Sequence, residues 1–555
     1  MKVKLSVVIV LLLTAASCRQ LEGTATAIYF NGKVWTGDST RPWASAIAVR
    51  EGRIIHAGDP DEKFRSSATT MIDLKGKLVV PGFIDNHTHF LQGGYNLTSV
   101  DLKNATSKET FIALLKKYCD QYPDDRWILG GTWDHEGWGG ELPEKSWIDS
   151  VCGAHPVFLS RYDGHMALAN SKALNLAGIN PGTPSREGGT IQKDVRGNPT
   201  GILKDGAMDL IDGIIPEPDE KSLDEYFEHA QQHAFSLGVT QVHDVCSFGG
   251  WNDLKTFQRN RSNNKQQIRI YSFVPLRDWD KLDSFCRLNG KGDDLLRWGG
   301  LKGYVDGSLG STTAWFYHDY LDAPGNTGFP IIDSLALQRQ VIAADKAGLH
   351  VAVHAIGDRA NDVILRIYNK AVQWNGERDR RFRVEHAQHL RKDAIDSFAS
   401  QKVIASMQPY HAIDDGRWAH KRLDEERLRG TYAFNSLIRA GALVTFGSDW
   451  FVAPLDPIMG IYAAVTRSTL DGKNPSGWHP EQKISVEQAL KCYTVNNAYA
   501  GFMEDRSGKI RKGYLADFVV LSDDLFNIAP EKIRSVKVER TIINGKEVFS
   551  RSDRP

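Results

Sequence analysis

The feature that most constrains the fold is a series of eight short apolar segments in the middle of the chain, mostly separated by helical stretches. The segments lie near residues 83, 238, 268, 301, 350, 381, 403 and 443. Buried strands that alternate with helices are typical of a parallel sheet, and eight of them predict a closed (β/α)₈ TIM barrel. Nearly every segment ends in polar, reactive residues, and barrel enzymes place their active sites at the carboxyl ends of the strands. We therefore expect an α/β protein with its chemistry at that end.

Short β-rich runs flank the barrel at both ends of the chain. Residues 26–82 and 508–555 contain runs broken by Asn-Gly, Glu-Gly or Lys-Gly turns, and such turns are typical of β-hairpins. They predict one small β-sandwich domain built from both termini, with a separate β-domain at each end as the alternative. The predicted barrel occupies residues 83–507.

The connection after the first barrel strand is too long for a plain βα loop. It runs from about residue 95 to 222 and is rich in tryptophan, so we expect an inserted subdomain that covers the mouth of the barrel. Trp133 in this insert is a candidate for lining an apolar or aromatic substrate pocket, with packing in a core as the alternative.

Residues 1–18 have the organisation of a signal peptide. Lys2 and Lys4 precede the apolar run 5–13, and small residues lead to Cys18. The run is too short to span a bilayer. The segment resembles a bacterial lipoprotein signal, apart from Ala15 where leucine is usual. We therefore expect an exported protein, anchored through lipid on Cys18 at the periplasmic side of the cell envelope. Cleavage followed by secretion is the alternative.

The charge balance gives no reason to expect a polyanionic partner. The chain has 68 basic and 68 acidic residues, so we expect a small-molecule substrate, no nucleic acid, and membrane contact only through the lipid anchor. The six cysteines include no Cys-X-X-Cys pair, which argues against a zinc knuckle or a thioredoxin-like site. An exported chain could pair some of these cysteines, but the sequence does not indicate which.

Polar residues at the ends of five predicted strands form a candidate metal-binding site. His87 and His89 end the first strand at a spacing of two residues, which places both imidazoles on one face. Four further strand ends supply one residue each, namely Lys302, His354, His386 and Asp449. Two histidines alone would be weak evidence, but this ordered set predicts a metal centre.

Several motifs resemble those of the amidohydrolase superfamily. PGFIDNHTH, VHAIGDRA, RVEHAQ and TFGSDW resemble its signature. RYDGHMALANSKAL, GNPTGILKDGA and VDGSLGSTTAWF are similar to its family-3 branch, which includes N-substituted formamide deformylase. The resemblance covers about Ala27 to Phe549 and implies a (β/α)₈ barrel with a β-sandwich from both termini.

The resemblance also implies two divalent metal ions, for which Zn²⁺ suits the imidazole and carboxylate ligands. His87, His89 and Asp449 would bind the more buried ion, and His354 and His386 would bind the second.

Lys302 would bridge both ions as a carboxylysine, the carbamate that its amine forms with CO₂. An ammonium would be repelled by the metals, whereas a buried lysine readily loses its charge. A structural ion pair with Asp306 is the alternative for this lysine.

The implied activity is that of a hydrolase acting on a non-peptide C–N bond through a metal-bound hydroxide. Bridging metals lower the pKa of a shared water from about 15.7 towards about 7. Asp449 would also take the hydroxide's proton and deliver it to the departing amine, unless it merely caps a helix.

Other residues are candidates for substrate binding. Asp163 and His165, in an Asp-Gly-His motif of the insert, could bind substrate or stabilise an oxyanion; a structural turn is the alternative. His411 follows the seventh strand and is another pocket candidate. His389 is predicted to be a surface histidine on the following helix.

Two alternative activities use the same barrel. A mononuclear deaminase typically carries His-X-X-Glu beyond the fifth strand, whereas here Ala355-Ile356-Gly357 follows His354. An esterase or lactonase remains open, because the same site attacks any activated carbonyl. A metal-binding protein without catalysis has no support in the sequence, because Asp449 is present.

Overall fold

The structure is a computed structural model that describes residues 23–103, 105–122, 125–133, 135–161, 166–185, 189–310 and 312–551. The chain forms two compact units. One contains the described residues up to Phe90 together with those from Gln231 onward, and the other is Leu91–Ala230. The predicted signal segment and Cys18 lie outside the described residues. Across the described ranges, every helix is too short or too polar to cross a membrane.

An eight-stranded parallel sheet forms the barrel of the first unit, in the order β21-β20-β19-β18-β17-β16-β15-β8. Its strands are β8 (Phe83–Thr88), β15 (Val239–Asp244), β16 (Arg269–Pro275), β17 (Leu296–Tyr304), β18 (His350–Ala355), β19 (Arg383–His386), β20 (Ile404–Met407) and β21 (Val444–Phe446). Each corresponds to one of the eight segments expected from the sequence. The predicted barrel is therefore confirmed.

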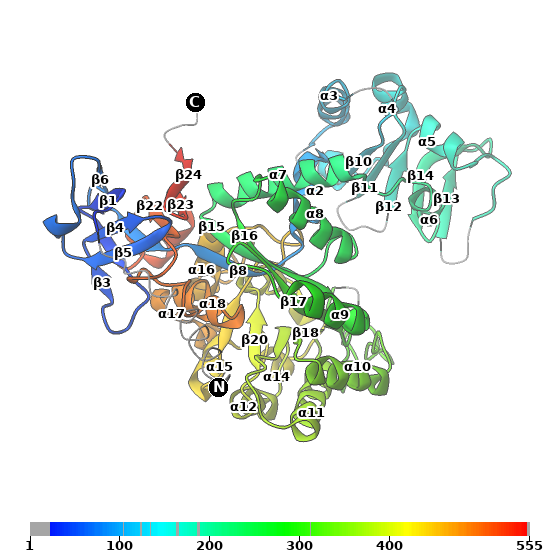
Figure 1. Cartoon of the computed structure of the whole chain (residues 1–555). Helices are drawn as coiled ribbons and strands as arrows, with labels where there is room; N and C mark the ends of the chain where they lie inside the picture. The colour runs from blue at the N-terminus through cyan, green and yellow to red at the C-terminus, as the bar shows by residue number, and fades with distance from the viewer. Residues whose placement is uncertain are drawn as a thin grey trace, which may run out of the picture. The chain divides into compact units, whose positions relative to one another are not determined.

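Helices separate consecutive barrel strands, as the pattern of the sequence predicts, and several lie around the outside of the sheet in Figure 1. They are α2 (Phe90–Thr98), α7 (Glu220–Ser236), α8 (Trp251–Ser262), α9 (Trp279–Asn289), α10 (Ser334–Lys346), α11 (Asp358–Asn375), α12 (Lys392–Ser400), α13 (Pro409–Asp415), α14 (Glu425–Leu428) and α15 (Phe434–Ala440). Beyond β21 come α16 (Pro457–Thr466), α17 (Val486–Cys492) and α18 (Val495–Ala500).

Helix α11 illustrates why these segments fold against the sheet. Its buried residues include Ala360, Val363, Ile364 and Ile367, which recur at the spacing that places side chains on one face of a helix. They join the main hydrophobic core together with Val353 of the neighbouring strand β18.

The first and last barrel strands meet at what we call the closure seam, formed by residues 87–89 and 449–450. Thr88 and Trp450 form a parallel β-bridge. The backbone N–H of Asp449 donates to the carbonyl of His87 at 2.8 Å, and that of His89 donates to the carbonyl of Trp450 at 2.6 Å. The seam therefore holds the two histidines of the first strand against the aspartate that follows the last.

Strands from both ends of the chain form one β-sandwich, made of the sheets β5-β4-β1-β6 and β24-β23-β22-β7-β2-β3. These are β1 (Ala27–Phe30), β2 (Lys33–Trp35), β3 (Trp43–Ala44), β4 (Ala46–Arg50), β5 (Arg53–Gly58), β6 (Thr70–Asp73), β7 (Leu78–Pro81), β22 (Phe518–Leu521), β23 (Val538–Ile543) and β24 (Lys546–Ser550).

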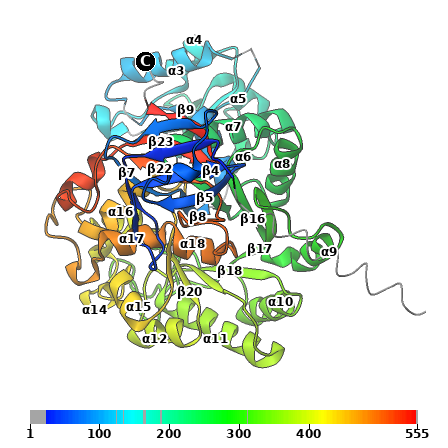
Figure 2. The same ribbon diagram turned by 60° about the vertical axis from the view of Figure 1, so that its left-hand side comes forward.

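C-terminal β22 pairs antiparallel with N-terminal β7, with Val519 opposite Val80. One core joins Tyr29 and Val49 to Phe518 and Ile542. Figure 2 shows the blue and red strands lying together. The structure thus has one sandwich from both termini, and not a separate domain at each end.

The second unit contains a six-stranded sheet of order β13-β14-β12-β11-β10-β9. Its elements are β9 (Val100–Asp101), α3 (Lys108–Cys119), β10 (Ile128–Trp133), α4 (Lys145–Cys152), β11 (Val157–Arg161), β12 (Met166–Ala169), α5 (Ser171–Leu176), β13 (Gly189–Lys193), β14 (Pro199–Asp205) and α6 (Asp209–Asp212). This unit has its own hydrophobic core, which includes Phe111, Trp133 and Trp147.

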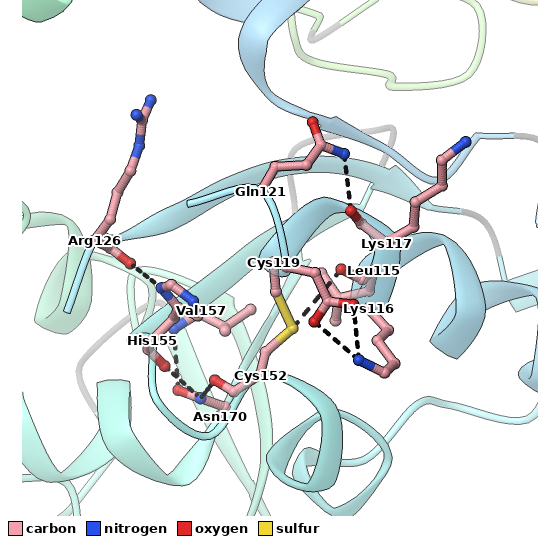
Figure 3. The surroundings of a disulfide bond; sticks show 11 residues. Leu115, Lys116, Lys117, Cys119, Gln121, Arg126, Cys152, His155, Val157 and Asn170 are labelled. Carbon is pink, nitrogen blue, oxygen red and sulfur yellow. Dashed lines mark hydrogen bonds and ion pairs between the residues drawn. A yellow bond between two sulfur atoms is a disulfide. The ribbon is translucent and has the colours of Figure 1, made fainter. Parts of the chain in front are cut away.

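A disulfide joins two helices of the second unit (Figure 3). It links Cys119 at the end of α3 to Cys152 at the end of α4, with a sequence separation of 33 residues. Both cysteines are buried in the core of this unit. The bond identifies one pair that the sequence alone did not indicate.

Candidate metal centre

The six predicted ligands lie at the carboxyl ends of five barrel strands. They are His87 and His89 at β8, Lys302 in β17, His354 in β18, His386 in β19 and Asp449 after β21. Parallel strands of a closed barrel present their carboxyl ends at one mouth. The fold thereby brings together side chains that are far apart in the sequence.

One group of donors lies at the closure seam. Ring nitrogens of His87 and His89 and a carboxylate oxygen of Asp449 lie within 4.8 Å of one another. The Nε2 atom of each histidine is 3.3 Å from Oδ1 of Asp449, and Nζ of Lys302 is 3.3 Å from Nε2 of His87. Imidazole nitrogen and carboxylate oxygen are the donor types of a transition-metal site, so this group fits a divalent cation.

The close approach of the strands at the seam requires a residue without a side chain at Gly447. A Cβ atom built there would lie 2.6 Å from the backbone nitrogen of His87. Real Cβ atoms do not tolerate such contacts with backbone, so the glycine of the Gly-Ser-Asp-Trp motif allows Asp449 to reach the first strand.

Hydrogen bonds fix the orientation of both histidines at the seam. Nδ1 of His87 donates to Oε2 of Glu385 at 2.5 Å, and Nδ1 of His89 donates to the backbone carbonyl of Cys246. Each bond leaves Nε2 free to face the cluster. Metal-binding histidines almost always use their second nitrogen in this way.

Glu385 belongs to a fully buried charge network that the sequence analysis did not identify. Its Oε1 accepts from Nε of Arg383 at 2.7 Å, and its Oε2 also accepts from Oγ of Ser406 at 2.6 Å. Burial favours the neutral acid, but Arg383 and His87 outweigh it and hold the pKa of Glu385 well below its usual range. The signal in the sequence was a pair of opposite charges, spaced by two residues, in a strand expected to be buried.

The second predicted pair of ligands, His354 and His386, also lies at the mouth, with ring centroids 4.5 Å apart. Nδ1 of His386 donates to Oε1 of Gln408 at 2.8 Å, so its Nε2 is the nitrogen that could bind a metal ion. Nε2 of His354 donates to the carbonyl of Gly307 at 3.0 Å, so its Nδ1 is the nitrogen that could bind a metal ion.

The electrostatics favour deprotonated ligands, as metal binding requires. Burial and the positive charge of Lys302 lower the pKa of His354 to about 3. Burial and the neighbouring His354 lower the pKa of His386 well below its ordinary value. Burial also lowers the pKa of Lys302. For Asp449, burial opposes ionisation, but His87 outweighs it and lowers the pKa of this carboxyl well below its ordinary value.

Left-handed backbone conformations occur at three positions of the site. The φ angles are 73° at His386, 59° at Asp449 and 80° at Cys246. Such angles are uncommon outside glycine, and they tend to occur at functional sites, where the surrounding structure enforces them. Arg383 and Glu385 share one face of β19, because side chains alternate between the two faces of a strand. The left-handed conformation at His386 interrupts this alternation at the end of the strand.

Two aromatic rings beside the predicted ligands were also missed by the sequence analysis. The ring of Tyr304 is 5.4 Å from that of His354, and the ring of Phe451 is 6.1 Å from that of His89. These residues remain 39% and 42% exposed. They give the site an accessible apolar border, which suits a substrate with an apolar group next to the reacting bond.

One of the substrate-binding residues predicted in the insert, Trp133, lies in a hydrophobic core. Trp133 is fully buried in the core of the second unit, and its indole N–H donates to the carbonyl of Leu159 at 2.8 Å. Because it has no exposed surface, Trp133 is a packing residue and not part of a pocket. Asp163 and His165 lie outside the described residues.

One expectation near the site is corrected, and one alternative is set aside. His389 is not a surface residue on α12, because it precedes the helix, is buried, and has Nδ1 2.8 Å from Oγ1 of Thr431. Asp306 is not an ion-pair partner of Lys302. It accepts backbone N–H bonds at 2.7, 3.0 and 2.8 Å, from Trp315, Ile356 and Gly357, respectively.

Comparisons with known proteins agree with this geometry. Residues 70–549 match the model of the Amidohydrolase family. The chain is 40% identical to Protein LONG AFTER FAR-RED 3 of Arabidopsis thaliana, over 95% of this chain and 92% of that protein. It is 27% identical to N-substituted formamide deformylase of Arthrobacter pascens, over 94% of this chain and 98% of that protein. An uncharacterized metal-dependent hydrolase from Pyrococcus horikoshii OT3 has a similar structure, with a TM-score of 0.77, 29% identity, and coverage of 91% of this chain and 99% of that chain.

Proposed function

Because the chain belongs to the amidohydrolase family, as its motifs predicted, we propose that this metal-dependent hydrolase cleaves a non-peptide carbon–nitrogen bond of amide type. The observation that carries the proposal is the convergence of His87, His89 and Asp449 with Lys302 at the closure seam. Similarity to an enzyme named N-substituted formamide deformylase favours an amide over other activated carbonyls.

We assign two divalent metal ions to the site, with Zn²⁺ preferred because the donors are imidazole and carboxylate. His87, His89 and Asp449 would hold one ion, and His354 and His386 would contribute to the other. When bound, such ions acidify water and polarise the substrate carbonyl.

Lys302 would supply a further ligand for the two ions in this proposal. Its burial lowers the pKa of Lys302 and so favours the neutral amine, which is the form that reacts with CO₂. The new N–C bond gives a carbamate and releases one proton, and the carbamate offers two anionic oxygens in place of a cation. This change relieves the repulsion that a charged lysine would experience beside two metal ions.

Asp449 carries the proton during hydrolysis. A carboxylate oxygen accepts a proton from the attacking water, while the water oxygen forms a bond with the carbonyl carbon. The same proton then passes to the substrate nitrogen as the C–N bond breaks. An amine is a poor leaving group unless it is protonated, so general acid catalysis by Asp449 matters more for an amide than for an ester.

The proposal is tested with paired amide and ester substrates that share one acyl group, drawn from a screen of formamides, N-acyl amino acids, cyclic imides and lactones. The full chain is assayed after loading with Zn²⁺ in bicarbonate buffer. We expect a higher kcat/KM for the amide. Strong ester hydrolysis without detectable amide cleavage across the screen would reassign the protein as an esterase or lactonase.

A further inference from the structure

A third imidazole lies at the second part of the centre. His411 belongs to α13, which begins directly after the seventh barrel strand. One of its ring nitrogens, a ring nitrogen of His386 and a carboxylate oxygen of Asp449 lie within 4.8 Å of one another. Among the described residues, two groups of three donors lie this close together. One group contains His411, and neither contains His354.

The position of His411 leaves a buried donor atom without a partner. Its Nε2 is fully buried, and none of the described residues forms a hydrogen bond with it. An unpaired buried polar atom is destabilising because it loses its hydrogen bonds to water, so such an atom in a native structure indicates a missing partner. Within a group of metal-type donors, the partner that suits an imidazole nitrogen is a cation.

The local sequence fixes His411 beside a known part of the site. Pro409 is the first residue of α13, where its restricted φ favours the start of a helix. Gln408, immediately before it, accepts the hydrogen bond from Nδ1 of His386 at 2.8 Å. One turn of the chain therefore orients the ring of His386 and carries the additional imidazole.

We propose that His411 is a ligand of the second metal ion, shared with His386 and Asp449. The inference rests on the metal dependence in the proposed function and adds an imidazole to the six ligands that the family resemblance implies. His386, His411 and Asp449 supply two imidazoles and one carboxylate, which are donor types of open catalytic sites, in addition to His354.

Metal content measured without substrate tests this proposal independently of the reaction catalysed. The full-length protein is stripped with a chelator, reloaded with Zn²⁺ or Co²⁺, and assayed by elemental analysis and by competition with a chromophoric chelator. His411→Ala and His411→Gln are compared with His420→Ala, which removes an exposed histidine elsewhere in the barrel unit. Circular dichroism establishes that each variant is folded.

We expect both His411 variants to lose at least about tenfold in affinity for one metal ion, because removal of even an outer-shell partner has this effect. Their Co²⁺ absorption spectra should also change, while His420→Ala matches the wild type. Unchanged metal affinity and spectra in folded His411 variants would overturn the proposal. A raised KM in those same variants would then assign His411 to substrate binding. Because the metal affinities and spectra are measured without substrate, failure of the amide screen would not affect them.

Discussion

The buried pair formed by Arg383 and Glu385 should control metal affinity through His87, although neither residue is a proposed ligand. In Glu385→Gln, Nδ1 of His87 would donate to a neutral amide oxygen instead of a carboxylate. The imidazole would then be less basic, and its Nε2 would be a weaker ligand. Loss of such an outer-shell carboxylate typically lowers metal affinity by about 10- to 100-fold, or roughly 1.4–2.7 kcal/mol.

The same substitution should lower the free energy of unfolding by a larger amount. Arg383 and Glu385 have no exposed side-chain surface, so the guanidinium of Arg383 would remain buried without its anionic partner. Removing one partner of a buried ion pair costs about 3–5 kcal/mol. Arg383 keeps a hydrogen bond to the carbonyl of Asn86 at 2.6 Å, which favours the lower end of that range.

The two effects are separated by measuring metal affinity at a temperature where the variant is folded, and stability by urea denaturation of the apo-protein. Ser406→Ala is the matched control. It removes a hydrogen bond to Oε2 of Glu385, the oxygen that accepts from His87, and one from Arg383 at 3.3 Å, but it leaves both charges. It should cost about 1 kcal/mol of stability and leave metal affinity close to that of the wild type. If folded Glu385→Gln binds metal as tightly as Ser406→Ala, the carboxylate does not support His87 as we argue.

Four further predictions address the site and the two units. Lys302→Ala should lose activity, and a short-chain carboxylic acid with added metal should partly restore it; a crystal structure with both ions bound and an unmodified Lys302 would contradict the carbamate. Asp449→Asn should lower kcat by roughly 10²–10⁴-fold in samples whose metal content, measured on the same preparation, equals that of the wild type; equal turnover would exclude its role as proton carrier. Burial lowers the pKa of His389 to about 3, so below pH ~6.5 the unfolded chain binds a proton that the folded protein does not; this group should therefore cost about 2 kcal/mol of stability between pH 6.5 and 5, and the fall should be smaller by that amount in His389→Gln. Reduction of the bond between Cys119 and Cys152 should destabilise the second unit by about 3–4 kcal/mol, from the chain entropy of a loop of this length, as measured by limited proteolysis under reducing and non-reducing conditions; equal cleavage rates would show that the bond does not constrain this unit.

The barrel could be predicted from the sequence because its signal is local. Each strand is a short apolar run, and residues such as His87 and His354 appear at strand ends, where parallel topology places them at one mouth. The sandwich was less certain from sequence alone, since the pairing of β7 with β22 depends on contacts between the two ends of the chain.

The partners of the ligands could not be predicted, because they depend on register between strands. Glu385 lies on β19 and bonds to His87 on β8, which is not a neighbouring strand. The carbonyl of Cys246 acts through the backbone, which carries no sequence signal. His389 was misplaced because the chain stays buried beyond β19 and α12 begins only at Lys392. Trp133 was misread because an aromatic side chain in a core and one in a pocket look alike in a sequence.

Because the closure seam joins the first barrel strand to the last, we expect the proposed metal site to form late in folding. Beside the seam, the backbone N–H of Ser448 donates to Asp85, and these residues are 363 positions apart in the sequence. Bringing such distant segments together costs on the order of 5 kcal/mol of chain entropy. A nascent or truncated polypeptide that lacks the eighth strand carries His87 and His89 but cannot complete their site. An ion bound there would connect the first strand to the last. We therefore expect loss of the ion to open the barrel first at this junction. Metal occupancy would then indicate whether the whole barrel has formed.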